Sequence, residues 1–174
     1  MRLFSLYFYY LILNKLPHSS VPVIGLPCER FKEFFIRRFF LSCGTNVNIA
    51  KGARFGNGKH IIIGNNFGIG MNCKVPNDIV IGEDVMMGVN VTIFGSNHVF
   101  DSTDIPMRKQ GIKKEKPVVI EDDVWIGSNS IIMPGRKLSK GSIIGAGSIV
   151  TKDFPPYSVI GGNPTRLLKS RIEN

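Results

Sequence analysis

The chain has 174 residues and a formal net charge of +9, a length that is typical of one domain and leads us to expect no second catalytic domain. The positive charge is compatible with nucleic acid, an anionic membrane surface or a phosphate-bearing ligand, so charge alone selects no partner. Three cysteines without a C-x-x-C pair (Cys28, Cys43 and Cys73) favour reduced thiols in a cytoplasmic protein over a disulfide framework or a thiolate zinc site.

Residues 1–42 differ in composition from the rest of the chain. Their apolar run over residues 3–13 is too short to cross a bilayer and precedes no small-residue cleavage site, so we expect no export. Aromatic residues and cations then alternate at roughly helical spacing and predict one or two short helices, the second amphipathic and basic. The residues concerned are Phe31, Phe34, Phe35, Phe39 and Phe40 with Arg30, Lys32, Arg37 and Arg38. The aromatic stripe is interpreted as packing on the protein or on a neighbouring subunit, with docking on anionic lipid as the alternative.

From residue 43 onward an aliphatic residue recurs at every sixth position, loosely at first and strictly from Ile63. The strict positions are Ile63, Ile69, Val75, Ile81, Met87 and Ile93, and then Ile120, Ile126, Ile132, Leu138, Ile144 and Val150. A helix needs a period of about 3.6 residues and a hairpin array a period of 2, so neither fits. A period of six predicts a chain coiled around a triangular prism, with three hexapeptides per coil and the aliphatic side chains stacked inside.

The interruption of this period divides the chain into three parts. We predict an N-terminal helical segment over 1–42, a β-helix over 43–155 with an excursion loop at 94–119, and a C-terminal tail over 156–174. The coils are expected at 63–80, 81–98, 120–137 and 138–155, after an imperfect coil at 43–60. His98 therefore ends a coil at the point where the chain leaves for the excursion.

Several segments of residues 41–170 resemble the hexapeptide-repeat acetyltransferases, in particular the branch that O-acetylates sugars, such as the galactoside, maltose and capsule enzymes. These segments are DDVWIGSNSIIMPG at 122–135, IIGAGSIVTKDFPPYSVIGGNPTRLLK at 143–169, GSNHVFD at 95–101 and PMRKQG at 106–111. The resemblance implies an all-β fold, a left-handed parallel β-helix with a short N-terminal helical segment and a C-terminal tail. The left hand is an exception to the usual crossover rule and comes from the resemblance alone.

The same resemblance implies acetyl-CoA as donor, a sugar hydroxyl as acceptor and a role in surface or capsular polysaccharide biosynthesis. A hydroxyl is a poor nucleophile until a base accepts its proton, and histidine, with an ordinary pKa of about 6.5, suits that task. Of His18, His60 and His98, the last lies in the motif that matches the family's catalytic histidine. Asp101 and Asp104 are nearby in sequence, and the group that orients His98 stays open.

The coenzyme residues are also assigned by resemblance. Gly127 and Ser128 would line the pantetheine arm, with backbone N–H groups near Ser128 facing the developing oxyanion. Ala146 would leave room for the arm, Thr151 and Lys152 would meet its far end, and Arg166 and Lys169 would reach the phosphates. Trp125 would flank the arm or pack against a neighbouring subunit. Sugar contacts are assigned to Asn72, Asn77 and Asp78, with turn formation as the alternative, and the lysine-rich stretch at 108–116 is interpreted as a solvated loop or a cover over the site.

The family's homotrimers, with active sites between subunits, imply the same assembly here. Amino-sugar or antibiotic N-acetylation, and a non-catalytic β-helix scaffold, remain alternatives. A γ-type carbonic anhydrase would need three imidazoles that converge on zinc, which His18, His60 and His98 do not readily supply, so we expect no metal. We expect no nucleic-acid partner and a cytoplasmic enzyme, with peripheral contact at the inner face of the membrane as an extension of that expectation.

Overall fold

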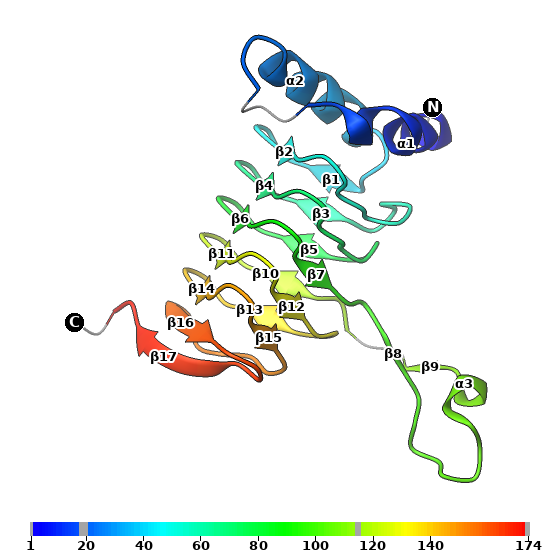
Figure 1. Cartoon of the computed structure of the whole chain (residues 1–174), viewed down its shortest axis with the longest axis vertical. Coiled ribbons are helices and arrows are strands. Elements are labelled where there is room, and N and C mark those ends of the chain that lie inside the picture. The colour runs from blue at the N-terminus through cyan, green and yellow to red at the C-terminus, as the bar shows by residue number, and fades with distance from the viewer. Residues whose placement is uncertain (1, 18–20, 114–115, 173–174) are drawn as a thin grey trace.

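In a computed structural model of the protein, which describes residues 2–17, 21–113 and 116–172, the chain coils into a three-sided prism (Figure 1). His18 and Lys114 lie outside the described residues. Two helices cover the N-terminal end of the prism, and an arm leaves it between two coils near the opposite end. Within the described residues, no helix has the length and apolar character needed to cross a bilayer.

The N-terminal cover consists of α1 (Arg2–Leu11), the 3-10 turn η1 (Leu13–Lys15) and α2 (Gly25–Ile36). Tyr9 of α1, together with Phe39 and Phe40 just after α2, is buried around Phe55 of the first coil, with ring centroids 5.1–6.2 Å from that of Phe55. Part of the aromatic stripe thus packs on the protein itself, since it closes the open end of the apolar prism interior.

The coils contribute short strands to three faces, and the strands of successive coils pair in parallel. On the third face the first two coils contribute only the single bridge residues Arg54 and Lys74. Face A contains β1 (Ser42–Cys43), β3 (Ile62–Ile63), β5 (Val80–Ile81), β10 (Val119–Ile120) and β13 (Lys137–Leu138). Face B contains β2 (Asn48–Ile49), β4 (Gly68–Ile69), β6 (Met86–Met87), β11 (Trp125–Ile126), β14 (Ile143–Ile144), β16 (Ser158–Gly161) and β17 (Arg166–Ser170), the last of which is antiparallel to β16. Face C contains β7 (Thr92–Ile93), β12 (Ile131–Ile132) and β15 (Ile149–Val150).

The aliphatic residues at the sixth positions form the core, as the period predicts. All twelve strict positions from Ile63 to Val150 are buried, with at most 8% of any residue exposed. The corners between faces repeat as well: Asn66, Asp84 and Asp123 occupy equivalent corners at φ values of 55°, 55° and 56°. Asn and Asp tolerate this left-handed conformation better than other residues with a side chain, which explains their place in the repeat.

The coil length varies at two places. Thr45 and Asn65 lie at equivalent corners 20 residues apart, whereas Asn65 and Glu83 are 18 apart. The first coil is longer because of residues 56–60, where Gly58 lies directly beneath the rings of Phe39 and Phe40. Between Glu83 and Asp122 the separation rises to 39 residues, because the arm is inserted after face C of that coil.

The arm contains β8 (Asn97–His98), α3 (Met107–Gln110) and β9 (Ile112–Lys113), and β8 pairs antiparallel with β9. The ladder of the prism is continuous on both sides of it. The amide of Phe94 still donates to the carbonyl of Ile132, and the carbonyl of Val118 accepts from the amide of Val80. The insertion therefore leaves the pairing of the coils intact.

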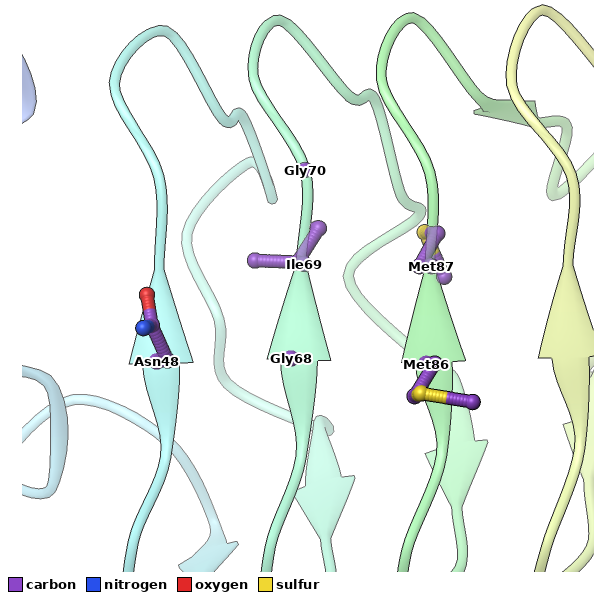
Figure 2. Close-up of a pocket in the computed structure, with 6 residues that line it drawn as sticks. All are labelled: Asn48, Gly68, Ile69, Gly70, Met86 and Met87. Atoms are coloured by element: carbon purple, nitrogen blue, oxygen red, sulfur yellow. The ribbon is translucent and has the colours of Figure 1, made fainter. Parts of the chain in front are cut away.

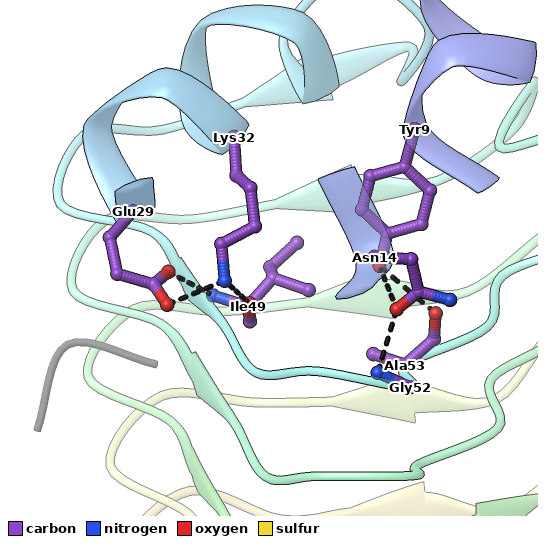
Figure 3. A network of polar contacts seen from close by, with 7 residues as sticks. All are labelled: Tyr9, Asn14, Glu29, Lys32, Ile49, Gly52 and Ala53. Atoms are coloured by element: carbon purple, nitrogen blue, oxygen red, sulfur yellow. Dashed lines mark hydrogen bonds and ion pairs between the residues drawn. The ribbon is translucent and has the colours of Figure 1, made fainter. Parts of the chain in front are cut away.

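Lys32 of the predicted basic helix is buried, although a cation of an amphipathic helix is expected to face solvent. Lys32 is 1% exposed; its Nζ lies 2.6 Å from Glu29 Oε1 and donates to the carbonyl of Ile49 at 2.7 Å (Figure 3). Glu29 Oε2 in turn accepts from the amide of Ile49. Lys32 faces inward because the first strand of face B has no earlier coil to pair with, and this ion pair satisfies its backbone groups.

Candidate active site

His98, the predicted base, lies on the arm. It occupies the second position of β8, where it pairs with Ile112 of β9, and its side chain is exposed. The adjacent amide of Val99 donates to the carbonyl of Gly111 at 3.1 Å, which extends the pairing beyond the strand. Figure 1 shows β8 and β9 as a stalk that projects from the prism. The imidazole is therefore held at a defined place outside its own coils.

The tip of the arm is fastened by Gln110. Its Oε1 accepts from the amide of Ser102, and its Nε2 donates to the carbonyls of Ser102 and Ile105 at 2.8 and 2.6 Å. Asp104 takes part only through its amide, which donates to Ser102 Oγ. The sequence reasoning assigned no role to Gln110, although it lies in the PMRKQG segment that carried the resemblance. These hydrogen bonds of Gln110, which we call the Gln110 clasp, were not predicted, because a loop without a repeat gives no signal for which side chains meet.

Gly127 and Ser128 lie at the corner between faces B and C, directly after β11. A Cβ at Gly127 would lie 2.5 Å from the amide nitrogen of Ala146, so the backbones of successive coils approach each other there. The amides of Gly127 and Asn129 donate to the carbonyls of Ile144 and Val89. The amides on either side of Ser128 are thus used in pairing between coils. Of the three amides at 127–129, the amide of Ser128 is the one that fits the predicted oxyanion donor.

A buried serine supports this corner from inside the prism. Ser130 Oγ donates to the carbonyl of Gly127 at 2.8 Å and contacts that of Gly145 at 3.1 Å. Ser148 repeats the arrangement one coil later, with its Oγ 2.6 Å from the carbonyl of Gly145. Both serines stand four residues after an aliphatic residue of the period, Ile126 and Ile144. Their hydrogen bonds fix the backbone next to Ser128 and Ala146.

Ser128 also borders a hollow of about 300 Å³ on the outer surface. Its other lining residues come from the three preceding coils: Ala50, Gly70, Met71, Met87, Gly88 and Val89. A second hollow, of about 220 Å³, lies beside it on face B (Figure 2). It forms where Gly68 leaves a gap between Asn48 and Met86, and Figure 2 shows these three residues side by side on adjacent strands.

The other predicted coenzyme residues lie on different parts of the prism. Thr151 and Lys152 follow β15 at the corner between faces C and A, where the Thr151 carbonyl lies 3.4 Å from Arg136 Nη1 and Lys152 Nζ lies 5.4 Å from the ring centre of Phe154. Arg166 and Lys169 are exposed on β17, at the C-terminal edge of face B. Ala146 is exposed at the corner that holds Ser128.

Trp125 points outward from face B and is 49% exposed. It pairs in register with Met86 on one side and Ile143 on the other, and Lys169 continues the same row through Val159. This row is an apolar strip that ends in a cation. Trp125 and Lys169 thus share a surface, whereas Thr151 and Lys152 flank the opposite side of face C.

The residues predicted to contact the sugar, Asn72, Asn77 and Asp78, also lie on different parts of the prism. Asp78 lies at the base of the arm, because a Cβ at Gly95 would be 3.4 Å from Asp78 Oδ1. Asn77 is next to it, and its carbonyl accepts from the amide of His60. Asn72 lies at the corner between faces B and C, in the left-handed conformation with φ 58°, and serves the turn. Only Asn77 and Asp78 are thus on the side of the prism from which the His98 arm leaves.

Burial favours the neutral form of two thiols, Cys73 and Cys43. Burial raises the pKa of Cys73 and of Cys43 to about 11 in each case, although the neighbouring Arg37 opposes the effect at Cys43. Thiols with such values are poor nucleophiles near neutral pH. The hydroxyl and imidazole groups near the arm and the corners are therefore the better candidates for chemistry.

The chain matches known proteins over most of its length. Residues 117–152 match the family described as "Bacterial transferase hexapeptide (six repeats)". The galactoside O-acetyltransferase of Escherichia coli is 36% identical over 140 residues, which cover 79% of this chain and 68% of the relative. The protein therefore belongs to the hexapeptide-repeat acetyltransferases and is an acetyltransferase of the galactoside and maltose O-acetyltransferase type.

Two solved structures agree with this assignment. A galactoside acetyltransferase in complex with coenzyme A has a TM-score of 0.79 and 33% identity, over 97% of this chain and 80% of that one. A maltose O-acetyltransferase from Clostridium difficile has a TM-score of 0.78 and 34% identity, over 97% of this chain and 85% of that one. The predicted left-handed parallel β-helix is thereby confirmed.

Proposed function

We propose that the protein transfers the acetyl group of acetyl-CoA to a sugar hydroxyl, with His98 as general base. The observation that carries this proposal is the arm, which holds one exposed imidazole by β8–β9 pairing on a fold whose relatives acetylate sugars. His98 would accept the proton of the acceptor hydroxyl while its oxygen forms the new ester bond to the acetyl carbon. The thioester C–S bond then breaks, and coenzyme A leaves as a thiol with the proton returned by His98. Acetyl-CoA supplies the activated acyl thioester.

The residues around face C fit an extended coenzyme. Exposed small residues occur at the corner between faces B and C: Ala146 and Gly147, where a Cβ at Gly147 would meet nothing within 4 Å. A narrow pantetheine chain could lie along such a surface without steric conflict. Exposed cations suited to phosphates, Lys152, Arg166 and Lys169, surround it at other corners and edges of the same end of the prism. We assign Gly127, Ser128 and Ala146 to the arm of the coenzyme, Thr151 and Lys152 to its far end, and Arg166 and Lys169 to its phosphates.

We further propose that the site is completed between subunits of a homotrimer. In one chain, the stalk carries His98 outward from the prism (Figure 1), while Ser128 and Ala146 remain at a corner of the coils. A neighbouring chain placed against that corner would bring its own arm to these residues. The exposed row of Trp125 and Met86 would then be covered by the neighbour rather than by water.

The acceptor is proposed to be a sugar unit of a surface or capsular polysaccharide, contacted by Asn77 and Asp78 at the base of the arm, with Asn72 as a more distant contact. The free thiols Cys28, Cys43 and Cys73 agree with a reducing cytoplasm as the site of the reaction. We propose no bound metal and no nucleic-acid partner.

The experiment is a thiol-release assay with acetyl-CoA over a panel of sugars, amino sugars, nucleotide sugars and polysaccharide fragments. We expect turnover with at least one hydroxyl acceptor. The variant His98→Ala should lose about 10²- to 10⁴-fold in kcat, because proton acceptance by a positioned base contributes that much. Binding of coenzyme A, measured by calorimetry, should stay within about twofold, since His98 is assigned to the proton and not to the coenzyme.

The matched control is His60→Ala, which removes another exposed imidazole, at the end of the first coil. It should retain activity. Equal losses in the two variants, or near-normal turnover in His98→Ala, would remove His98 as the base. Turnover with amino sugars and none with hydroxyl acceptors would replace O-acetylation by N-acetylation on the same scaffold.

A further inference from the structure

The outer side of α1 is apolar although it faces solvent. Its inner side is held on the prism by Tyr9, whose hydroxyl donates to the carbonyl of Ala53. On the opposite side Leu3, Phe4, Tyr7 and Leu11 are each at least 64% exposed. These four residues recur at helical spacing and share one face. A surface helix normally places polar residues there, so α1 has the composition of a helix with apolar partners on both sides.

The second helix has its polarity reversed. The charged side chains Glu29 and Lys32 point inward to the backbone of Ile49, as Figure 3 shows. Its exposed residues include Leu26, Phe31 and Phe34, with 64%, 48% and 51% of each residue exposed. The helix therefore turns apolar side chains to solvent while it buries an ion pair.

Aromatic contacts join these residues into one surface. The ring of Phe8 stacks on Phe4 of the same helix at 5.7 Å and reaches Phe31 and Phe35 of α2 at 6.4 and 4.9 Å. Phe35 also contacts Phe34 at 5.3 Å. We call this surface, Leu3, Phe4, Tyr7, Leu11, Leu26, Phe31 and Phe34, the apolar cap. It spans both helices at the end of the prism farthest from β17 (Figure 1).

The charges near the apolar cap are predominantly positive. Residues 1–42 hold six cations and two acids, Glu29 and Glu33. Glu29 is neutralised by buried Lys32, and Glu33 pairs with Arg37. Arg30 is exposed between the apolar residues of α2, and the guanidinium of Arg38 lies 3.4 Å above the ring of Phe34. Basic side chains around an apolar helical surface match the headgroups and acyl boundary of an anionic bilayer.

We propose that the apolar cap docks the protein on an anionic lipid surface, with α1 and α2 in the plane of the interface. A second copy of this chain is the less suitable occupant, because it would bring Arg30 and Arg38 against the same cations in a chain of net charge +9. The docking leaves β17 and the arm directed away from the membrane, where an acceptor and coenzyme can reach them (Figure 1).

The test is co-sedimentation of the full chain with vesicles of phosphatidylcholine alone or with phosphatidylglycerol added, at low and high salt. We expect binding to the anionic vesicles that weakens as salt rises. Phe4→Ser and Phe31→Ser should each weaken it about tenfold, since each removes a ring that would be buried in the interface. Arg30→Gln should weaken binding to anionic vesicles about fivefold and leave binding to neutral vesicles unchanged.

The control variant is Ile172→Ser, a similarly exposed apolar residue at the opposite end of the chain. It should bind vesicles like the unaltered protein, and thermal melting should show that all four variants are folded. Absence of vesicle binding by the unaltered protein would overturn the proposal. So would a fall in assembly mass on Phe4→Ser in the absence of lipid, which would show that a second copy covers the cap. Acetyl transfer to a soluble sugar is independent of both results.

Discussion

At the scale of single residues, two glycines of face B and its corner, Gly68 and Gly127, differ in what surrounds them. A Cβ at Gly127 would meet the backbone of Ala146 at 2.5 Å, whereas one at Gly68 would meet nothing within 4 Å. Neither has a positive φ, so the difference between them is one of space.

We therefore predict that Gly127→Ala lowers the free energy of unfolding by about 1–3 kcal/mol, because the coils must separate locally. The matched variant Gly68→Ala should be neutral or stabilising by up to about 1 kcal/mol, since it restricts the unfolded chain without a clash. Urea titration of both variants checks this. Equal destabilisation would mean that the close approach at Gly127 is not what limits the side chain.

Cys73 gives a second prediction at this scale, because burial raises its pKa to about 11. In the unfolded chain the pKa of a thiol is about 8.5, so the two states bind protons equally below pH ~8. As the pH rises further, the unfolded state loses its proton first, and the free energy of unfolding falls until the folded thiol also ionises.

We expect the urea midpoint to decline between about pH 8.5 and 11 in the unaltered protein. The decline should be smaller in Cys73→Ala, while the half-buried Cys43, whose pKa is also about 11, continues to contribute in both proteins. The comparison uses the slope against pH, because Cys73→Ala also removes buried volume. Identical slopes would contradict the raised pKa of Cys73.

At the scale of elements, the N-terminal helices replace a missing coil. The amide of Ile49 donates to Glu29 Oε2 and its carbonyl accepts from Lys32 Nζ, and Asn14 Oδ1 accepts from the amide of Gly52 at 2.7 Å. Tyr10 donates to the carbonyl of Gly56 and accepts from the amide of Phe55. An open end of a parallel solenoid would otherwise present unpaired backbone groups to another chain.

This arrangement predicts an unequal cost for two lysine variants. Lys32→Met leaves the Glu29 carboxylate buried without its partner and should lower the free energy of unfolding by about 3–5 kcal/mol. Lys140→Met breaks an exposed ion pair with Asp122 and should cost less than about 1 kcal/mol. Urea titration measures both. A loss below 1 kcal/mol for Lys32→Met would show that Glu29 is solvated or protonated in the folded protein.

The sequence predicted some of these elements better than others. The burial of Ile63 to Val150 followed from their period, because a six-residue repeat leaves one way to stack aliphatic side chains. The burial of Lys32 did not follow from the sequence. Helical spacing shows which residues share a face of the helix, but not whether that face meets solvent or the first coil. The arm between Phe94 and Val118 has no period, so neither the β8–β9 pairing nor the Gln110 clasp could be foreseen.

At the scale of the whole molecule, the shared site can be tested by mixing inactive chains. His98→Ala removes the proposed base, and Ala146→Trp would block the proposed coenzyme surface. If each site takes His98 from one chain and Ala146 from the next, equal mixing after dissociation should restore about a quarter of the sites. The measurement is acetyl transfer before and after exchange, with the trimer confirmed by sedimentation. No recovery in an exchanged trimer would place both groups of a site in one chain.

The location of the site residues was less predictable than the fold. The family motif predicts Trp125, Ser128 and Thr151 as site residues, and in the structure they lie on different faces and corners of one prism. A motif records which residues occur together in a family and does not tell which chain presents each of them. Whether these residues meet in one cleft depends on the assembly, which the period of a single chain does not describe.

The coils before and after the arm are hydrogen-bonded directly to each other, so the arm is not needed for their pairing. Val80 of β5 pairs with Val119 of β10 although the arm separates them in sequence. The arm can therefore be lengthened, shortened or exchanged with little strain on the coils. The sequence of the arm can thus vary while the stacked hexapeptides maintain the fold. A library confined to residues 99–111 should therefore leave the urea midpoint of the coils nearly unchanged.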